Sequence, residues 1–219
     1  MTDFVLVASP LVGAPSWAAT ANVLRTRGAR VHVPDVPAST PWRDWPARLQ
    51  QLLAGVDRPI LVGHSAAGLL IADLAIKLSA SKLIFLDAQI PPVGGAVPPV
   101  DNSFMQFVNT LPVENGLLPI WSQWWGANGV MRLFADPSQA IAFEQNLPRT
   151  LRAWFDDSFN LRPWGHVPAA YIQTSTMFAP QAEDATKRGW PVVRIAGTHL
   201  HPLLAPEETA DAIEAMARA

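Results

Sequence analysis

One serine, flanked on both sides by small residues, is the strongest chemical signal in this sequence. Ser65 lies within Gly-His-Ser-Ala-Ala-Gly, residues 63–68, after the apolar run Ile-Leu-Val. A nucleophilic serine on a sharp strand-to-helix turn needs small residues two places before and two places after it. Gly63 and Ala67 meet that need, and the last glycine of the G-x-S-x-G pattern comes one place late, at Gly68. We predict that Ser65 is a nucleophile exposed at the edge of a sheet.

The same turn would point the start of the following helix at the serine. The Ala66 N–H is therefore predicted to be one donor of an oxyanion hole.

A serine hydroxyl also needs an adjacent base, and histidine is the side chain suited to that role at neutral pH. The sequence offers five histidines, at positions 32, 64, 166, 199 and 201, and no cysteine. The missing cysteines exclude a cysteine nucleophile, a thiolate metal site and a disulfide framework.

Composition excludes several other classes of function. The 219 residues carry 16 Lys and Arg against 18 Asp and Glu, a net charge of −2. Nucleic acids and anionic membrane surfaces are recognised through clustered positive charge, so neither is an expected partner. The histidine pair at 199 and 201 has no carboxylate beside it in the sequence, and no glycine-rich phosphate-binding motif is present. We therefore expect a small hydrophobic substrate, no metal and no cofactor.

The start of the chain and its hydropathy predict a location. Residues 1–3 lead directly into an apolar strand, without the basic and long apolar regions of a secretory signal. No apolar run reaches the roughly 20 residues that would span a bilayer. A single core commonly grows to roughly 250 residues, so the length fits one domain. We expect a cytoplasmic, single-domain protein.

Short apolar runs alternate with helical segments along most of the chain. The expected strands are residues 4–7, 30–33, 59–62, 82–86, 169–173 and 192–195. The expected helices are residues 16–27, 46–54, 66–78, 181–188 and 206–218. Repeated strand–helix units imply an α/β fold, a mostly parallel sheet with helices on both faces. Such sheets bind ligands at the carboxyl ends of their strands.

Residues 90–165 depart from this alternation. Prolines interrupt the segment, Asp136-Pro137 is typical of a helix start, and five of the nine tryptophans lie there. We interpret the segment as a helical cap inserted into a core formed by residues 1–89 and 166–219. Part of it is predicted to line an apolar pocket over the nucleophile, formed by Trp121, Trp124 and Trp125. The alternative is that these rings pack the cap onto the sheet.

The order of these motifs resembles the α/β-hydrolase superfamily, and more closely its small esterase and hydroxynitrile-lyase-like branch. The resemblance covers nearly the whole chain. Its main features are Val5-Leu-Val before a turn, the serine motif, Leu83-Ile-Phe-Leu-Asp-Ala, and Gly197-Thr-His followed by Pro206-Glu-Glu. It implies the α/β-hydrolase fold and a chain order of Ser, acid and His. It places the base at His199, with His201 as the competitor, and leaves structural roles for His32, His64 and His166.

The acid departs from the pattern that the resemblance implies. In that branch it follows the strand at residues 169–173, but the next five residues contain no carboxylate, and Met177 stands in the usual position. Some superfamily members carry the acid one strand earlier, where Asp87 ends a predicted strand. We predict that Asp87 orients His199 and stabilises its cationic form. The alternatives are a dyad without an acid, Glu183 or Asp184.

The second oxyanion donor also departs from that pattern. The superfamily commonly has His-Gly-X after its first strand, with the X amide as donor, but this chain has Ala8-Ser9-Pro10. Proline has no N–H to donate. The second donor is then the Leu11 N–H, through a one-residue shift of the loop, or the Ser9 hydroxyl, or it is missing. Losing one such donor can lower turnover roughly 100-fold to 1000-fold.

Together these expectations describe a serine hydrolase acting by acyl transfer on a hydrophobic or aromatic ester, thioester or lactone. Two alternatives keep the same scaffold. One is a lyase or cyclisation catalyst that uses Ser65 and His199 as acid and base. The other is a non-catalytic, ligand-binding protein that has lost catalysis, with Pro10 in place of an oxyanion donor and Met177 in place of the acid.

Overall fold

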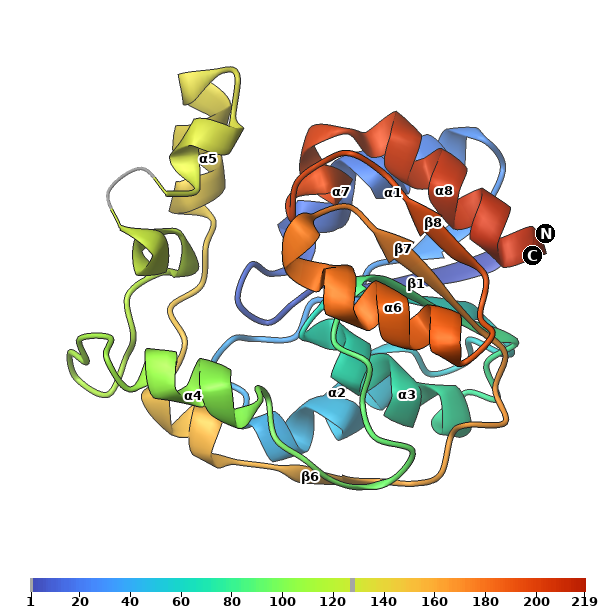
Figure 1. Cartoon of the computed structure of the whole chain (residues 1–219), viewed down its shortest axis with the longest axis horizontal. Helices are drawn as coiled ribbons and strands as arrows, with labels where there is room; N and C mark the ends of the chain where they lie inside the picture. Colours follow the sequence, from blue (N-terminus) through green and yellow to red (C-terminus); the bar gives the residue numbers. More distant parts are fainter. Residues whose placement is uncertain (1, 127–128) are drawn as a thin grey trace.

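Parallel strands form the centre of the computed structural model, which describes residues 2–126 and 129–219 (Figure 1). The sheet has six strands in the order β2-β1-β3-β4-β7-β8, each parallel to its neighbours. The strands of this sheet are β1 (Asp3–Val7), β2 (Arg30–His32), β3 (Ile60–Ser65), β4 (Lys82–Ala88), β7 (Ala169–Gln173) and β8 (Val192–Arg194). The predicted α/β fold class is confirmed.

Helices cover both faces of this sheet (Figure 1). The α-helices are α1 (Ala18–Thr26), α2 (Trp45–Leu52), α3 (Ala67–Lys77), α4 (Asn102–Val108), α5 (Pro137–Gln145), α6 (Ala179–Lys187), α7 (His201–Leu204) and α8 (Pro206–Arg218). Short 3-10 helices are η1 (Ala14–Trp17), η2 (Trp42–Asp44), η3 (Trp121–Trp125), η4 (Met131–Leu133), η5 (Arg152–Asp156) and η6 (Thr176–Phe178). Buried residues of α1 and α8 pack on one face, and those of α2, α3 and α6 on the other.

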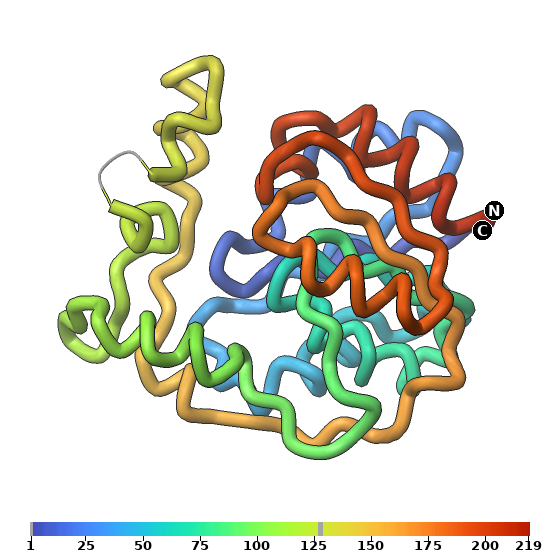
Figure 2. The backbone as a smooth tube through the Cα atoms, in the orientation of Figure 1, coloured from blue at the N-terminus to red at the C-terminus, as the bar shows by residue number. Residues whose placement is uncertain are grey.

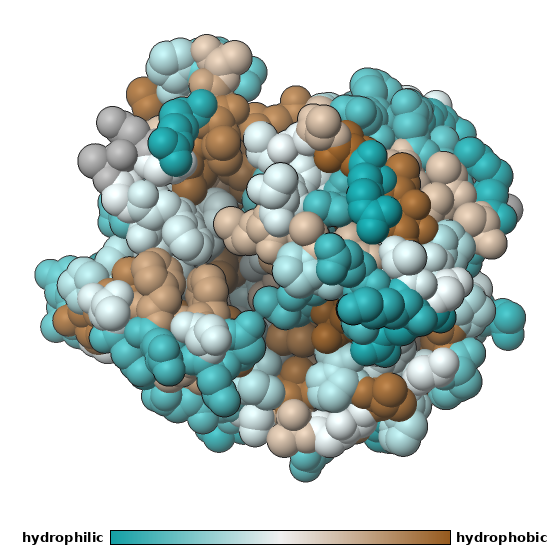
Figure 3. Space-filling model, viewed as in Figure 1, coloured by the Kyte–Doolittle hydropathy of each residue, from teal (hydrophilic) through white to brown (hydrophobic). Residues whose placement is uncertain are grey.

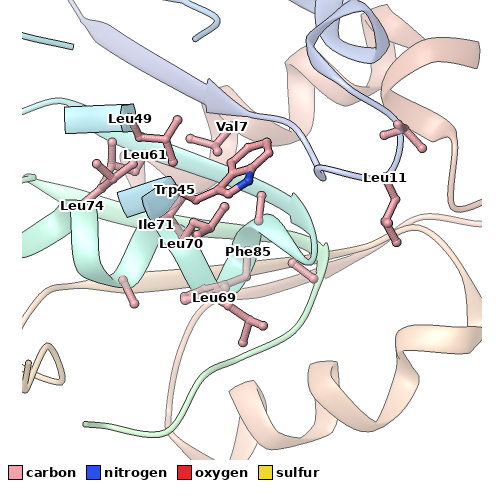
Figure 4. Close-up of a cluster of buried hydrophobic side chains, with 14 of the residues drawn as sticks. Val7, Leu11, Trp45, Leu49, Leu61, Leu69, Leu70, Ile71, Leu74 and Phe85 are labelled. Atoms are coloured by element: carbon pink, nitrogen blue, oxygen red, sulfur yellow. The ribbon is translucent and has the colours of Figure 1, made fainter. Parts of the chain in front are cut away.

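The central strands β1, β3, β4 and β7 are mainly apolar because both of their faces are covered. In β1, Val5 and Val7 join the core on the α2–α3 face, whereas Phe4 and Leu6 join the core under α1 and α8. Figure 4 shows the first of these cores, with strand residues packed against the α2 and α3 side chains Trp45, Leu49, Leu70, Ile71 and Leu74. Leu11 lies apart from the other labelled residues, on the loop that follows β1 (Figure 4).

Residues 90–165 leave the sheet after β4 and return to it before β7 (Figure 2). They contain α4, α5, three of the 3-10 helices and a two-stranded antiparallel sheet of β5 (Gly95–Val97) and β6 (Phe159–Leu161). Some aromatic residues of this segment pack on the core: Trp154 lies 4.7 Å and Phe159 5.3 Å from Trp42, between ring centroids. Asp136 caps α5 as expected, because its carboxylate accepts from the Ser138 N–H.

The strand order reverses direction at β1, where the chain first adds β2 on one side and then β3 on the other. Ligands of open parallel sheets bind beyond the carboxyl ends of the strands at such a point. Ser65 and Asp87 lie at the carboxyl ends of β3 and β4, and His199 follows β8. Within the described residues, no helix has the length and apolar character needed to cross a membrane.

Candidate active site

The turn after β3 holds Ser65 in a strained backbone conformation. Its φ is +59°, in the left-handed region that non-glycine residues rarely adopt, and α3 begins two residues later. A Cβ on Gly63 would lie 2.9 Å from the Ala67 carbonyl oxygen, so this position must be glycine. The strain is typical of functional turns. The local sequence therefore produces the sharp elbow that was predicted.

Gly68 is required for a different reason. A Cβ at this position would lie 2.1 Å from the backbone oxygen of Gln89, so α3 approaches the chain after β4 at that point. The glycine that comes one place late in the motif thus allows helix–strand packing. Ala67, at the last position of the elbow pattern, is fully buried.

Asp87 and His199 form a pair at the end of the sheet. The Nδ1 atom of His199 lies 3.1 Å from Oδ2 of Asp87, whose side chain is fully buried. The other carboxylate oxygen, Oδ1, accepts hydrogen bonds from the backbone N–H groups of Thr174 at 2.7 Å and Ser175 at 3.0 Å. The Ser175 hydroxyl donates to Oδ2 at 2.5 Å. Burial alone would raise the pKa of Asp87, but the His199 contact and these hydrogen bonds outweigh it and hold that pKa below its ordinary value.

The segment after β7, which lacks the expected acid, instead supplies these donors. Thr174 and Ser175 begin this segment, and their roles were not predicted from sequence. Their roles could in principle have been expected, because a carboxylate buried at the end of a strand needs several hydrogen-bond donors nearby. The two alternative acids on α6 are not brought to His199: Asp184 pairs with Arg188 at 2.8 Å, and Glu183 is exposed.

Histidine at position 64 contacts the His199 segment. Its Nε2 lies 2.8 Å from the backbone oxygen of His199, and the two imidazole rings are 4.5 Å apart. Because a carbonyl only accepts, Nε2 carries the proton. Burial, followed by the nearby His199, lowers the pKa of His64 to about 3. His64 is therefore a buried, neutral residue that holds the backbone of His199 in place.

The competitor His201 has a different environment. It begins α7, is buried, and its Nε2 lies 3.1 Å from Oε2 of Glu208 on α8. The ring of His199, in contrast, stacks face to face on Phe178, with centroids 4.9 Å apart. The structure thus brings His199 to Asp87 and ties His201 to the C-terminal helix.

A cavity of about 60 Å³ opens at these residues. It is lined mainly by apolar side chains: Leu11, Ala66, Pro99, Val100, Phe104, Trp121, Trp125, Met177 and Phe178, with Ser65, Gln89 and His199. Ser65 and His199 therefore face a common space. Among the described residues no hydrogen bond joins them, and such bonds often tighten only when substrate binds.

Two of the three predicted substrate-binding tryptophans line this cavity. Trp121 lies 6.1 Å from the His199 ring, and Trp125 packs edge-on against Trp121 at 6.0 Å, between centroids. Trp124 does not line the cavity: it is buried, and its Nε1 donates to the Pro119 oxygen at 2.8 Å. Adjacent residues of η3 point different ways, which sequence alone did not resolve.

The loop after β1 brings Leu11 to the cavity. The Ser9 carbonyl accepts from the N–H groups of Val12 at 3.0 Å and Gly13 at 2.9 Å, which closes a tight turn. The Leu11 N–H has only a long contact, 3.4 Å, to the Ser9 hydroxyl. Ser9 itself is buried and lines a neighbouring cavity. Leu11 and Ala66 thus line the cavity that Ser65 faces, whereas Ser9 lines the neighbouring cavity.

Comparisons with known proteins identify the family to which this chain belongs. A model of the alpha/beta hydrolase family matches residues 4–212. An extracellular alpha/beta-hydrolase from a Paenibacillus species, described as sharing structural and functional homology with tobacco salicylic acid binding protein 2, is similar over 100% of both chains, with a TM-score of 0.76 and 17% identity. Polyneuridine aldehyde esterase is similar over 99% of both chains, with a TM-score of 0.74 and 16% identity.

Tomato methylketone synthase I is similar over 99% of this chain and 98% of its own, with a TM-score of 0.76 and 17% identity. At these identities the solved structures establish a common fold. No protein of curated function matches the sequence. The resemblance read from the motifs is confirmed, because the family model spans nearly the whole chain. The chain belongs to the alpha/beta hydrolase family.

Proposed function

We propose that the protein is a serine hydrolase that acts by acyl transfer on a hydrophobic or aromatic ester, thioester or lactone. The observation that carries this proposal is the buried Asp87–His199 pair, in which His199 lines the same cavity as a strained serine. Family membership and the esterases and hydrolases among its structural relatives support the same reaction class.

The mechanism follows from the position of each group. Ser65 Oγ attacks the substrate carbonyl carbon while its proton passes to Nε2 of His199. The His199 Nδ1–H donates to Asp87, whose charge favours the imidazolium. The oxyanion of the tetrahedral intermediate accepts from the N–H groups of Ala66 and Leu11. Collapse breaks the bond to the alcohol, which leaves with the proton from Nε2.

The second half-reaction uses the same groups with water. His199 takes a proton from a water molecule, and the resulting hydroxide attacks the carbonyl carbon of the Ser65 acyl-enzyme. The second intermediate collapses, the proton returns from Nε2 to Ser65 Oγ, and the carboxylic acid is released. The apolar lining from Trp121, Trp125 and Phe178 supports a neutral, hydrophobic substrate.

An activity-based fluorophosphonate probe tests the proposal directly. We expect covalent labelling of the native protein that is lost in Ser65→Ala and in His199→Ala, and retained in His201→Ala. His201 is the matched control because it is a neighbouring histidine bound to Glu208. If the folded wild-type protein is not labelled, the serine is not activated and the non-catalytic alternative holds. Labelling without turnover across a panel of aryl and alkyl esters would instead favour the lyase or cyclisation alternative.

A further inference from the structure

A second, larger cavity lies beside the candidate active site. It has a volume of about 360 Å³ and lies between α5, the loop after β1, and α7; we call it the α5 groove. Its apolar walls are formed by Val12, Phe134, Ala142, Phe143, Leu203 and Leu204. Figure 3 shows the molecule hollowed between the arm that carries α5 and the body, with hydrophobic residues on the sides of the hollow.

The cavity at Ser65 is too small to hold a whole substrate of ordinary size. Its volume is about 60 Å³, whereas ligand sites commonly measure roughly 300–1,000 Å³. The α5 groove reaches that range by itself. An ester with one bulky arm therefore needs a second space, and the groove is an apolar space near the cavity.

Two loops of the chain contribute residues to both spaces. Leu11 lines the cavity at Ser65 and Val12 lines the α5 groove, and consecutive Cα atoms are only about 3.8 Å apart. On the other side, His199 lines the cavity and Leu203 lines the groove, and the Leu203 N–H bonds back to the Leu200 oxygen at 2.9 Å. The groove is thus bordered by the same two loops as the candidate active site.

The lining also indicates the chemistry of the occupant. Among the described residues that line the groove none has an ionisable side chain, and the rings of Phe134 and Phe143 lie 5.3 Å apart in its wall. Gln139 and Asn146 are exposed polar residues at its edge. A charged group would lose its hydration in this environment without a partner. The groove therefore suits a neutral, extended apolar group.

We infer that the α5 groove and the cavity at Ser65 form one bipartite substrate site, in which the groove holds the long apolar arm of the ester. This inference rests on the proposed hydrolase function of Ser65. It gives α5 a role in substrate selection: esters with one long arm are preferred over esters with two short arms.

The test fills the groove from α5. Ala142 is exposed on that helix and lines the groove, so Ala142→Trp adds bulk to the groove without disturbing the core. The matched control is Ile141→Trp, at the adjacent position of the same helix, which is 54% exposed and does not line the groove. Both variants are first checked for an unchanged circular dichroism spectrum and melting temperature.

Selectivity is measured as the ratio of kcat/KM for p-nitrophenyl octanoate to that for p-nitrophenyl acetate. Ethyl and octyl acetate test the alcohol arm in the same way. In one of the two series, the acyl or the alcohol series, we expect Ala142→Trp to lower the preference for the eight-carbon substrate about tenfold. A loss of this size follows when about two methylene groups are no longer buried. Ile141→Trp should leave the ratio unchanged.

A binding measurement separates this inference from the proposed function. Calorimetry on the Ser65→Ala background should show that Ala142→Trp weakens binding of N-methyloctanamide, while Ile141→Trp does not. If ester hydrolysis does not depend on Ser65 but this binding difference remains, the proposed function fails and the groove stands. If hydrolysis depends on Ser65 but both tryptophan variants behave alike in selectivity and binding, the groove inference is overturned.

Discussion

Removing the Ser175 hydroxyl tests the stabilisation of the buried Asp87 carboxylate. In Ser175→Ala, Oδ2 of Asp87 loses the donor at 2.5 Å and keeps His199, while Oδ1 keeps the two backbone donors. A hydrogen bond to a charged group contributes about 1.5–3 kcal/mol to stability. Asp87 is fully buried, so water does not replace the lost donor. We expect the free energy of unfolding at pH 7 to fall by about 2 kcal/mol.

The pH dependence of that loss identifies its electrostatic origin. The pKa of Asp87 lies below its ordinary value of 3.8, so the ionised carboxylate stabilises the fold above about pH 4. This contribution is lost as the pH falls through the folded-state pKa. Ser175→Ala weakens the bonds to the ionised form and so raises that pKa. The stability difference between wild type and variant should therefore shrink as the pH falls through the folded-state pKa of Asp87 in the variant and then through the lower one in the wild type.

Urea unfolding at a series of pH values from neutral to acidic measures this difference. The control is Ser81→Ala, because the Ser81 hydroxyl donates to the neutral carbonyl of Pro59 at 3.2 Å. It should cost about 1 kcal/mol or less, with no dependence on pH. A double-mutant cycle with Asp87→Asn isolates the interaction between the two side chains. A Ser175→Ala loss that stays constant across pH, or a cycle without coupling, would refute the assignment.

The remaining predictions concern the acid, the oxyanion loop and the packing of α3. Asp87→Asn should lower kcat by up to about 10⁴-fold, as expected when the imidazole loses its carboxylate partner, whereas Glu183→Gln should not change it; equal effects on ester turnover would contradict the assignment of the acid. Leu11→Pro removes the second N–H and should lower kcat roughly 100-fold to 1000-fold, while Leu11→Ala keeps that N–H and much of the activity; similar kcat values would remove Leu11 from the oxyanion hole. Gly68→Ala forces a Cβ onto the Gln89 oxygen and should destabilise the fold by about 1–3 kcal/mol or more, whereas Gly165→Ala meets only ordinary contacts and should not; thermal unfolding compares the two.

The sheet and its helices could be predicted from sequence because their signals are local. Buried strands are continuously apolar, and Asp136 before proline marks a helix start. The segment from His201 to Leu204 was not predicted to be helical, because four residues are too few for a periodic pattern. The neighbours of Asp87 were missed for another reason. Their hydrogen bonds link residues 87 positions apart or more, so no local pattern reports them.

The strand order explains how an acid one strand earlier still reaches His199. β7 lies between β4, which carries Asp87, and β8, which precedes His199. Asp87 has a φ of +41°, and its side chain reaches the backbone that follows β7. The residues at that point act as donors, so a carboxylate in their place would repel Asp87 instead of stabilising it. An acid at position 175 is therefore incompatible with the Asp87 arrangement, whereas Met177, at the position where the resemblance implies the acid, lines the cavity instead.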